Sequence, residues 1–211
     1  MLLTFNDYNL KVKNKTLLEN TNFSFVKGKI NHILGKNGVG KSQFAKDLLL
    51  NMSGLITPEI SDNVTIISSF SNVPNDLSSK ELLAILRKRF GADSVEHLAS
   101  SLHVENISMN TLIGQLSDGQ KQKLKLLSFL LEDKSIIVFD EITNALDKQT
   151  INDIYLFLNK YVAEQPEKFI LNITHNLSDL KNLGGNYYLI EDLKMTSFEQ
   201  QDDVIKAYIE G

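Results

Sequence analysis

The stretch GKNGVGKS, residues 35–42, decides the fold of this chain. It fits the pattern G-x-x-x-x-G-K-[ST], in which glycines let the backbone curl and turn its N–H groups inward as an anion-binding nest. The apolar segment KINHIL, 29–34, leads into it, and QFAKDLLLNMSG, 43–54, follows with helical spacing. A glycine-rich loop between a strand and a helix predicts the phosphate-binding loop of a nucleoside triphosphatase, and the flanking elements argue against a chance glycine turn.

The residue types of this loop suit a triphosphate with its metal. Lys41 would reach the β- and γ-phosphates, and the Ser42 hydroxyl would ligate Mg²⁺. ATP and Mg²⁺ are therefore the expected ligands. The candidate phosphate-binding residues are Gly35, Asn37, Gly38, Val39, Gly40, Lys41, Ser42 and Gln43.

Two later segments end in polar side chains at the point where a buried strand should stop. SIIVFDE, 135–141, has four consecutive apolar residues and then Asp140 and Glu141, while KFILNITH, 168–175, ends in His175. The carboxyl ends of parallel strands form the ligand-binding edge of open α/β sheets. Asp140 is the candidate Mg²⁺ carboxylate, and Glu141 the candidate that polarises the attacking water. A neutral His175 there could hydrogen-bond that water or a γ-phosphate, although each pattern alone also fits an ordinary strand end.

The stretch LSDGQ, 116–120, stands at the predicted start of a helix. Ser117 and Gln120 have the spacing of a capping box, in which each side chain satisfies a backbone N–H near the other residue. A hydroxyl and a glycine at a helix N-terminus are also suited to binding phosphate. The local sequence is compatible with both roles.

Composition bounds the class of protein. The chain has 211 residues, of which 42% are hydrophobic and 23% charged, so it fits one globular unit or one with a small inserted subdomain. A net charge of −4 and a pI near 5.6 argue against a nucleic-acid binder. The lack of cysteine excludes disulfides, thiolate metal sites and cysteine nucleophiles. With neither a secretory signal nor a long apolar run, we expect a cytoplasmic protein that could still dock on a membrane protein.

Strands and helices should alternate along most of the chain. The expected strands lie at 2–12, 21–28, 29–34, 64–70, 135–141, 168–175 and 186–192, and the expected helices at 43–54, 78–90, 94–102, 120–133, 148–166 and 199–211. Such alternation predicts an α/β fold with a mostly parallel sheet. We expect one domain over residues 1–211, with a catalytic core at 1–74 and 117–211 and a helical subdomain at 75–116.

The motifs follow one another in the order GKNGVGKS, LSDGQ, SIIVFDE, NALD at 144–147 and ITH at 173–175. This order resembles the nucleotide-binding domain of ABC ATPases, where the stretches would be the Walker A loop, signature, Walker B strand, D-loop and switch histidine. The resemblance covers essentially the whole chain. It implies a P-loop NTPase fold with an ABC-type core, a mixed sheet, an N-terminal antiparallel β subdomain and a short helical subdomain.

In that family two such domains pair head to tail, and each ATP lies between the Walker A loop of one and the signature of the other. The resemblance implies that Glu141 and His175 are catalytic and that Asp147 belongs to the D-loop linking the two sites. It also implies two partners, a second nucleotide-binding domain in a homo- or heterodimer and an integral membrane permease. The protein would then lie on the cytoplasmic face of the membrane. The signature residues acting in trans would be Ser117, Asp118, Gly119 and Gln120.

Two departures from the family pattern concern the nucleotide. Asp118 stands where the signature usually has glycine. We expect it to point away from the nucleotide, because like charges about 6 Å apart cost on the order of 3 kcal/mol at an effective dielectric of about 20. Val12 stands where an aromatic residue usually stacks on adenine. Reduced stacking predicts loose base selectivity, with GTP able to compete.

Two further departures lie after strands. The family's Q-loop glutamine should follow VTIISSF, 64–70, but Ser71 and Asn72 stand there, and Asn72 is the candidate for the amide role at the metal. Coupling to a membrane partner should therefore be atypical. Ile142 replaces the proline that commonly follows the Walker B glutamate, which we interpret as tolerated variation.

The leading hypothesis is the ATP-binding and hydrolysing subunit of an ABC transporter whose membrane subunit is a separate chain, with an exporter favoured over an importer. The alternative is a soluble ABC-type ATPase of the assembly or defence kind, without a transmembrane partner. A non-hydrolysing switch conflicts with the presence of Glu141 and His175. A small-molecule kinase would not need LSDGQ or NALD.

Overall fold

The computed structural model describes residues 2–211, which form two compact units. The first contains the residues up to Ile66, Lys134–Glu141 and Asn159–Gly211, and the second contains Ile67–Asp133 and Ile142–Leu158. The strands are β1 Leu2–Val12, β2 Lys15–Val26, β3 Ile30–Leu34, β4 Val64–Ser68, β5 Ile136–Asp140, β6 Phe169–Ile173, β7 Gly185–Glu191 and β8 Lys194–Phe198. The helices are α1 Lys41–Leu50, α2 Pro58–Ser61, α3 Ser79–Phe90, α4 Ala92–Ser101, α5 Asp118–Leu130, α6 Lys148–Glu164, α7 Leu177–Asn182 and α8 Gln201–Glu210, with 3₁₀ turns η1 Val104–Asn106 and η2 Ile113–Gln115.

The main sheet has the strand order β4-β5-β6-β3-β7-β8, and β1 and β2 form a separate antiparallel pair. Strands β5, β6, β3 and β7 run parallel, and β8 adds an antiparallel edge, so the sheet is mixed. Every residue of β3, β5 and β6 is buried. This is the pattern of parallel strands covered on both faces, and it explains their continuous apolar sequences.

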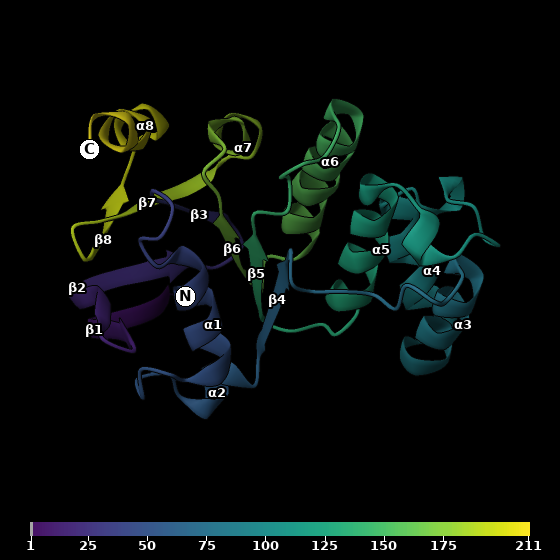
Figure 1. Cartoon of the computed structure of the whole chain (residues 1–211), viewed down its shortest axis with the longest axis horizontal. Helices are drawn as coiled ribbons and strands as arrows, with labels where there is room; N and C mark the ends of the chain where they lie inside the picture. Colours follow the sequence, from purple (N-terminus) through teal and green to yellow (C-terminus); the bar gives the residue numbers. More distant parts are fainter. Residues whose placement is uncertain (1) are drawn as a thin grey trace. The chain divides into compact units, whose positions relative to one another are not determined.

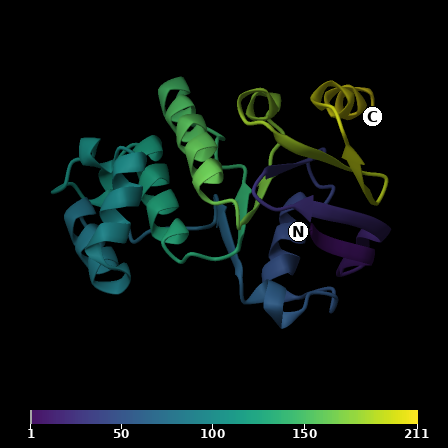
Figure 2. The ribbon, with the colours of Figure 1, turned by 180° about the vertical axis from the view of Figure 1, so that it is seen from behind.

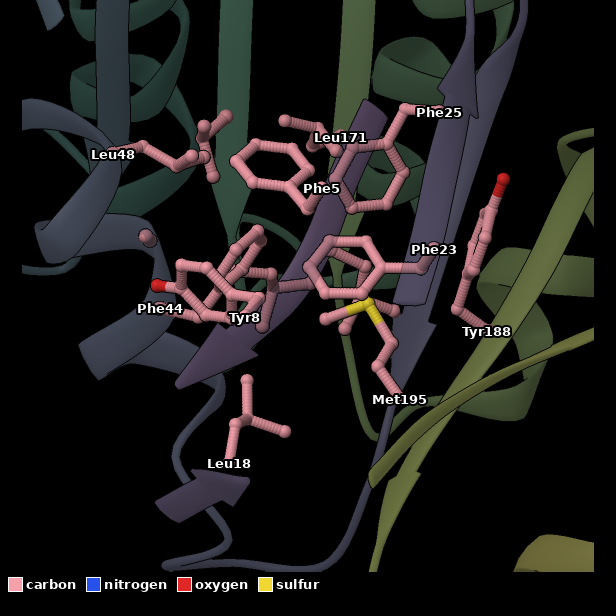
Figure 3. Packing of buried hydrophobic residues seen from close by; sticks show 14 of the residues in the cluster. Phe5, Tyr8, Leu18, Phe23, Phe25, Phe44, Leu48, Leu171, Tyr188 and Met195 are labelled. Carbon is pink, nitrogen blue, oxygen red and sulfur yellow. The ribbon is translucent and has the colours of Figure 1, made fainter. Parts of the chain in front are cut away.

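Layers on both faces of the sheet enclose these strands in the first unit. Figures 1 and 2 show α1 and the β1–β2 pair on one side of the sheet, with α7 and α8 on the other. On the α1 side, aromatic rings from three elements pack together, with the stacked pair Phe5 and Phe23 at 4.9 Å between centroids and Phe44 of α1 edge-on to both (Figure 3). Such ring pairs add about 0.5–1.5 kcal/mol each beyond the burial of their area. They fix the helix that follows the phosphate loop.

A buried polar network holds the end of α1. The Tyr8 hydroxyl donates to Oδ2 of Asp47 at 2.5 Å, and the backbone N–H and hydroxyl of Ser53 donate to the same carboxylate at 2.6 and 2.7 Å. Asp47 is fully buried, and burial together with this carboxylate raises the pKa of Tyr8. Three donors compensate the cost of burying the charge, so β1, α1 and the following loop are tied at one point.

The second unit contains the helical elements α3, α4 and α5. A capping box starts α3, in which Ser78 Oγ accepts from the Glu81 N–H and the Glu81 carboxylate accepts from the Ser78 N–H. Buried apolar residues, mostly leucines, supply the apolar stripe of each helix that packing requires. Within residues 2–211, the structure has no helix whose length and hydropathy would let it cross a bilayer.

The expected elements are present, with differences at their ends. The helix after the phosphate loop begins at Lys41 and ends at Leu50, because Asn51 adopts a left-handed conformation and its N–H bonds to the Asp47 carbonyl. β2 begins at Lys15 rather than at residue 21. Three short elements were not predicted from the sequence: α2, α7 and β8, of four, six and five residues.

Candidate nucleotide site

A pocket of about 350 Å³ lies between the turn end of the β1–β2 hairpin and the phosphate loop, within the first unit. It brings together eight predicted site residues: Val12, Asn37, Gly38, Gly40, Lys41, Ser42, Gln43 and Glu141. Lys15 and Leu17 also line the pocket, and neither is among the residues predicted from the sequence. Gly35 and Val39 belong to the same loop but do not line the pocket.

Close packing sets the loop's shape. Gly40 has φ +116°, and a Cβ there would lie 3.0 Å from Cβ of Leu17. Glycine is therefore needed both for the backbone conformation and for the approach of β2. The next residue begins α1, so the loop runs directly into the helix N-terminus, where free N–H groups favour an anion.

Lys41 is buried with its amine among backbone carbonyls. Nζ donates to the carbonyl oxygens of Gly35 at 2.6 Å and Lys36 at 3.2 Å. Burial lowers the pKa of Lys41, while the charges of Glu141 and Asp140 act in the opposite direction. A cation held in this way beside a nest of N–H groups is suited to bind a polyphosphate.

Ser42 and Asp140 form the candidate metal site. Ser42 Oγ donates to Oδ1 of Asp140 at 3.1 Å. Burial raises the pKa of Asp140, the Ser42 hydrogen bond opposes that rise, and the nearby Glu141 charge adds to it. Across residues 2–211 no group of three or more His, Cys, Asp or Glu side chains is arranged to hold a metal. A hydroxyl with one carboxylate fits Mg²⁺, which is usually bound through one or two carboxylates together with substrate phosphates.

Glu141 and His175 meet at the carboxyl edge of the sheet. Nδ1 of His175 lies 2.9 Å from Oε1 of Glu141, and the Glu141 N–H donates to the Ile173 carbonyl at 2.9 Å. Glu141 has φ +57°, a left-handed conformation that costs a residue with a side chain about 1–2 kcal/mol. This conformation directs the chain out of β5 just where the carboxylate lines the pocket.

The second unit holds LSDGQ at the start of α5. Ser117 Oγ accepts the Gln120 N–H at 3.2 Å, and the Ser117 N–H donates to Oε1 of Gln120 at 3.1 Å, which confirms the predicted capping box. Ser117 and Asp118 are exposed. Gly119 is buried, and a Cβ on it would lie 2.4 Å from Oγ1 of Thr150 in α6. Packing against α6 therefore requires glycine here, a constraint with no signal in the local sequence.

Asp147 also contacts Thr150. Its carboxylate accepts the Thr150 N–H at 2.9 Å and the Thr150 hydroxyl at 2.7 Å, and these bonds lower the pKa of Asp147. The residue thus caps the start of α6. Thr150 therefore contacts both Asp147 and Gly119 of LSDGQ.

The remaining sequence candidates also lie in the second unit. Asn72 is exposed, after β4 and outside the pocket lining. Ser71 has a structural role, because its Oγ accepts the Ser68 N–H at 3.1 Å where β4 ends. Ile142 is buried with an exposed fraction of 5%, so an aliphatic side chain suits the position.

Comparisons with known proteins place the chain in a family. The family model described as ABC transporter matches residues 18–144. A "Probable peptide export ATP-binding protein YydI" from Bacillus subtilis (strain 168) is 57% identical over 203 residues, which cover 96% of this chain and 97% of that protein. An "Energy-coupling factor transporter ATP-binding protein EcfA1" from Mesomycoplasma hyopneumoniae is 32% identical and covers 77% of this chain and 67% of its own length.

Solved structures share the fold. A bacterial Atm1-family ABC exporter with ATP bound matches with a TM-score of 0.80 at 19% identity, over 99% of this chain and 41% of the exporter chain. An ATP-binding subunit of an ABC transporter matches with a TM-score of 0.78 at 20% identity, over 100% of this chain and 99% of that subunit. The chain therefore belongs to the ABC transporter family and is one of its ATP-binding ATPases.

Proposed function

We propose that this chain is the ATPase subunit of a peptide exporter and that it powers a separate integral membrane permease from the cytoplasmic face of the membrane. The observation that carries the proposal is the 57% identity to a probable peptide export ATP-binding protein over nearly the full length of both chains. Residues 2–211 contain no membrane-spanning helix, which is consistent with a permease on a separate chain.

In the proposed reaction, Lys41 and the phosphate loop would bind the triphosphate, and Ser42 and Asp140 would hold an Mg²⁺ ion, which would supply neutralisation of the phosphate charge. Glu141 lines the same pocket and accepts a hydrogen bond from the attacking water. His175 contacts the Glu141 carboxylate and orients it toward that water. Asn37, Val39 and Gln43 would complete the phosphate contacts, and Val12 would pack against the base.

We further propose that the active form is a head-to-tail dimer, made of two copies or of this chain and a related one. The pocket is lined entirely by the first unit, while Ser117 is exposed at the N-terminus of α5 in the second. Its hydroxyl and the adjoining N–H groups would meet the γ-phosphate held by the partner domain. Asp118 would point away from that phosphate, and Asp147 would lie along the D-loop between the two sites.

Residues 1–74 and 117–211 would serve as the catalytic core and residues 75–116 as the helical subdomain. The segment after β4 is the candidate contact with the permease, because Phe70 there is 75% exposed. Ser71 and Asn72 replace the expected glutamine, an observation that favours the alternative of a soluble ATPase without a membrane partner.

Two measurements test these proposals. Glu141→Gln should hydrolyse ATP at least about 100-fold more slowly than the wild type, because the substitution removes the base and leaves the other nucleotide contacts in place. Glu210→Gln, an exposed change in α8, should leave the rate unchanged. Equal rates for Glu141→Gln and the wild type would remove Glu141 from catalysis.

The second measurement concerns the partners. Glu141→Gln should elute as a dimer with ATP and as a monomer without it, and the tagged chain should co-purify with an integral membrane protein from detergent extracts of its source cells. Recovery without any membrane protein would favour the soluble alternative.

A further inference from the structure

The base end of the pocket is formed by one face of the β1–β2 hairpin. Val12 and Lys15 are direct cross-strand partners that close the hairpin, so their side chains lie on the same face. Leu17 follows two residues after Lys15, where the register of the hairpin shifts. All three line the pocket. Because the phosphate loop forms the other wall, a nucleotide bound there would direct its purine toward these residues.

Lys15 places a cation at this wall. Its Nζ donates to the Gly38 carbonyl at 3.1 Å, so this side chain reaches from the hairpin to the phosphate loop. An ammonium group has three donors, so two remain available when one is held by Gly38. The bond to Gly38 also limits the rotamers of a long side chain, which lowers the entropy cost of a further contact.

The two purines differ in what they present to such a donor. Guanine and hypoxanthine carry two adjacent acceptors, N7 and O6, on one edge, whereas adenine carries the N7 acceptor beside an N6 amino donor. A lysine ammonium can bond to both acceptors of a 6-oxopurine, but it faces an N–H donor at the second position of adenine. Val12 and Leu17 are aliphatic and supply no aromatic ring to favour adenine by stacking.

We propose that Lys15 is a base-specificity residue that selects 6-oxopurine nucleotides, GTP and ITP, and lets them bind at this site at least as well as ATP. The observation that carries the inference is the placement of Lys15 on the pocket face of the hairpin, held at Gly38 and next to Val12. The inference deepens the proposed function and rests on it for the location of the nucleotide.

The test measures dissociation constants for ATP, GTP and ITP by isothermal titration calorimetry, using the Glu141→Gln chain so that turnover does not interfere. Lys15→Met keeps the aliphatic stem and removes the ammonium. The matched control is Lys11→Met, which makes the same change on the opposite face of the hairpin, where Lys11 pairs with Thr16 and does not line the pocket. Thermal unfolding of both variants checks that the hairpin is intact.

We expect Lys15→Met to weaken GTP and ITP binding by about tenfold and ATP binding by less than about threefold, with no change in Lys11→Met. Equal losses for all three nucleotides would show a phosphate contact and overturn the inference. Unchanged affinities, or a loss for GTP without one for ITP, would also overturn it. This experiment measures nucleotide binding and neither hydrolysis nor transport. Its outcomes can therefore be interpreted even if the chain proves not to be part of an exporter.

Discussion

Nδ1 of His175 lies 2.9 Å from Oε1 of Glu141, although 34 residues separate them in sequence. The contact exists because β5 and β6 are parallel neighbours whose carboxyl ends coincide, with Asp140 opposite Ile173. Each residue alone is an ordinary strand end. Glu141 lines the pocket and His175 contacts its carboxylate from outside that lining, which makes Glu141 the candidate catalytic residue and His175 its positioning residue.

His175→Ala should reduce kcat for ATP hydrolysis by about 100-fold, since the Glu141 carboxylate loses the contact that orients it and a misplaced catalytic group can cost that much. The dissociation constant for ATP should change by less than about threefold, because His175 does not line the pocket. Steady-state kinetics with parallel binding titrations check both values. His97→Ala, an exposed histidine change in α4, is the control, and a kcat within threefold of wild type in His175→Ala would contradict the assignment.

Asp140→Asn should abolish Mg²⁺-dependent hydrolysis and at the same time stabilise the unliganded protein. Burial raises the pKa of Asp140 in the folded state, so its ionised form opposes folding at neutral pH, and an amide can still accept the Ser42 hydrogen bond. The gain should be about 1 kcal/mol, or about 2–4 °C in Tm. Calorimetry at neutral pH measures it, with the exposed Asp203→Asn in α8 as control.

The pH dependence of Tm tests whether the ionised Asp140 carboxylate destabilises the folded protein. The difference in Tm between Asp140→Asn and the wild type should shrink as pH falls through the raised pKa, because the wild-type carboxyl then becomes neutral too. A lower Tm in Asp140→Asn at neutral pH would contradict the prediction.

Gly119→Ala should destabilise the second unit by about 1–3 kcal/mol, because the new methyl would lie 2.4 Å from Oγ1 and 2.9 Å from Cγ2 of Thr150. Thr150→Ala removes both atoms, so the double variant should unfold close to Thr150→Ala alone. Urea unfolding of the four proteins gives the coupling energy. Gly184→Ala, where no atom lies within 4 Å of the new Cβ, serves as the control. Additive effects would show that the two residues do not clash.

Acid should destabilise the protein through His32, which lies fully buried in β3. Its Nε2 contacts the Leu183 carbonyl at 2.9 Å, and Asn172 donates to its Nδ1 at 3.2 Å, so the ring is neutral. Burial lowers the pKa of His32 to about 4, with the Leu183 carbonyl and Asp179 acting in the opposite direction. The folded pKa lies below the ordinary 6.5, so stability present above 6.5 is lost as pH falls toward 4, by about 3 kcal/mol.

Urea unfolding between pH 4.5 and 7.5 tests this effect. His32→Gln should flatten the loss of stability over that interval, whereas the exposed His97→Gln should retain the wild-type slope. An unchanged slope in His32→Gln would assign the acid sensitivity to other groups.

Sequence reasoning identified the elements with strong local signals. The strands β3, β5 and β6 are continuous apolar runs because both faces of the sheet are covered. It misplaced the start of β2, where Leu17 and Leu18 are consecutive and both buried, so the alternation expected of a strand is missing. It missed β8, in which Met195 alone is buried and pairing with β7 sets the conformation.

The amino-acid sequence alone determined the order of the motifs, the chemistry of the phosphate loop, and the strand ends that carry Asp140, Glu141 and His175, because these properties depend on residue type and on neighbours along the chain. Only the tertiary structure decided that Lys15 bonds to the Gly38 carbonyl and that Gly119 packs on Thr150. Lys15 and Gly38 are 23 positions apart in the sequence, and Gly119 and Thr150 are 31 positions apart. These contacts arise from how the hairpin and the helices pack, which no local pattern encodes.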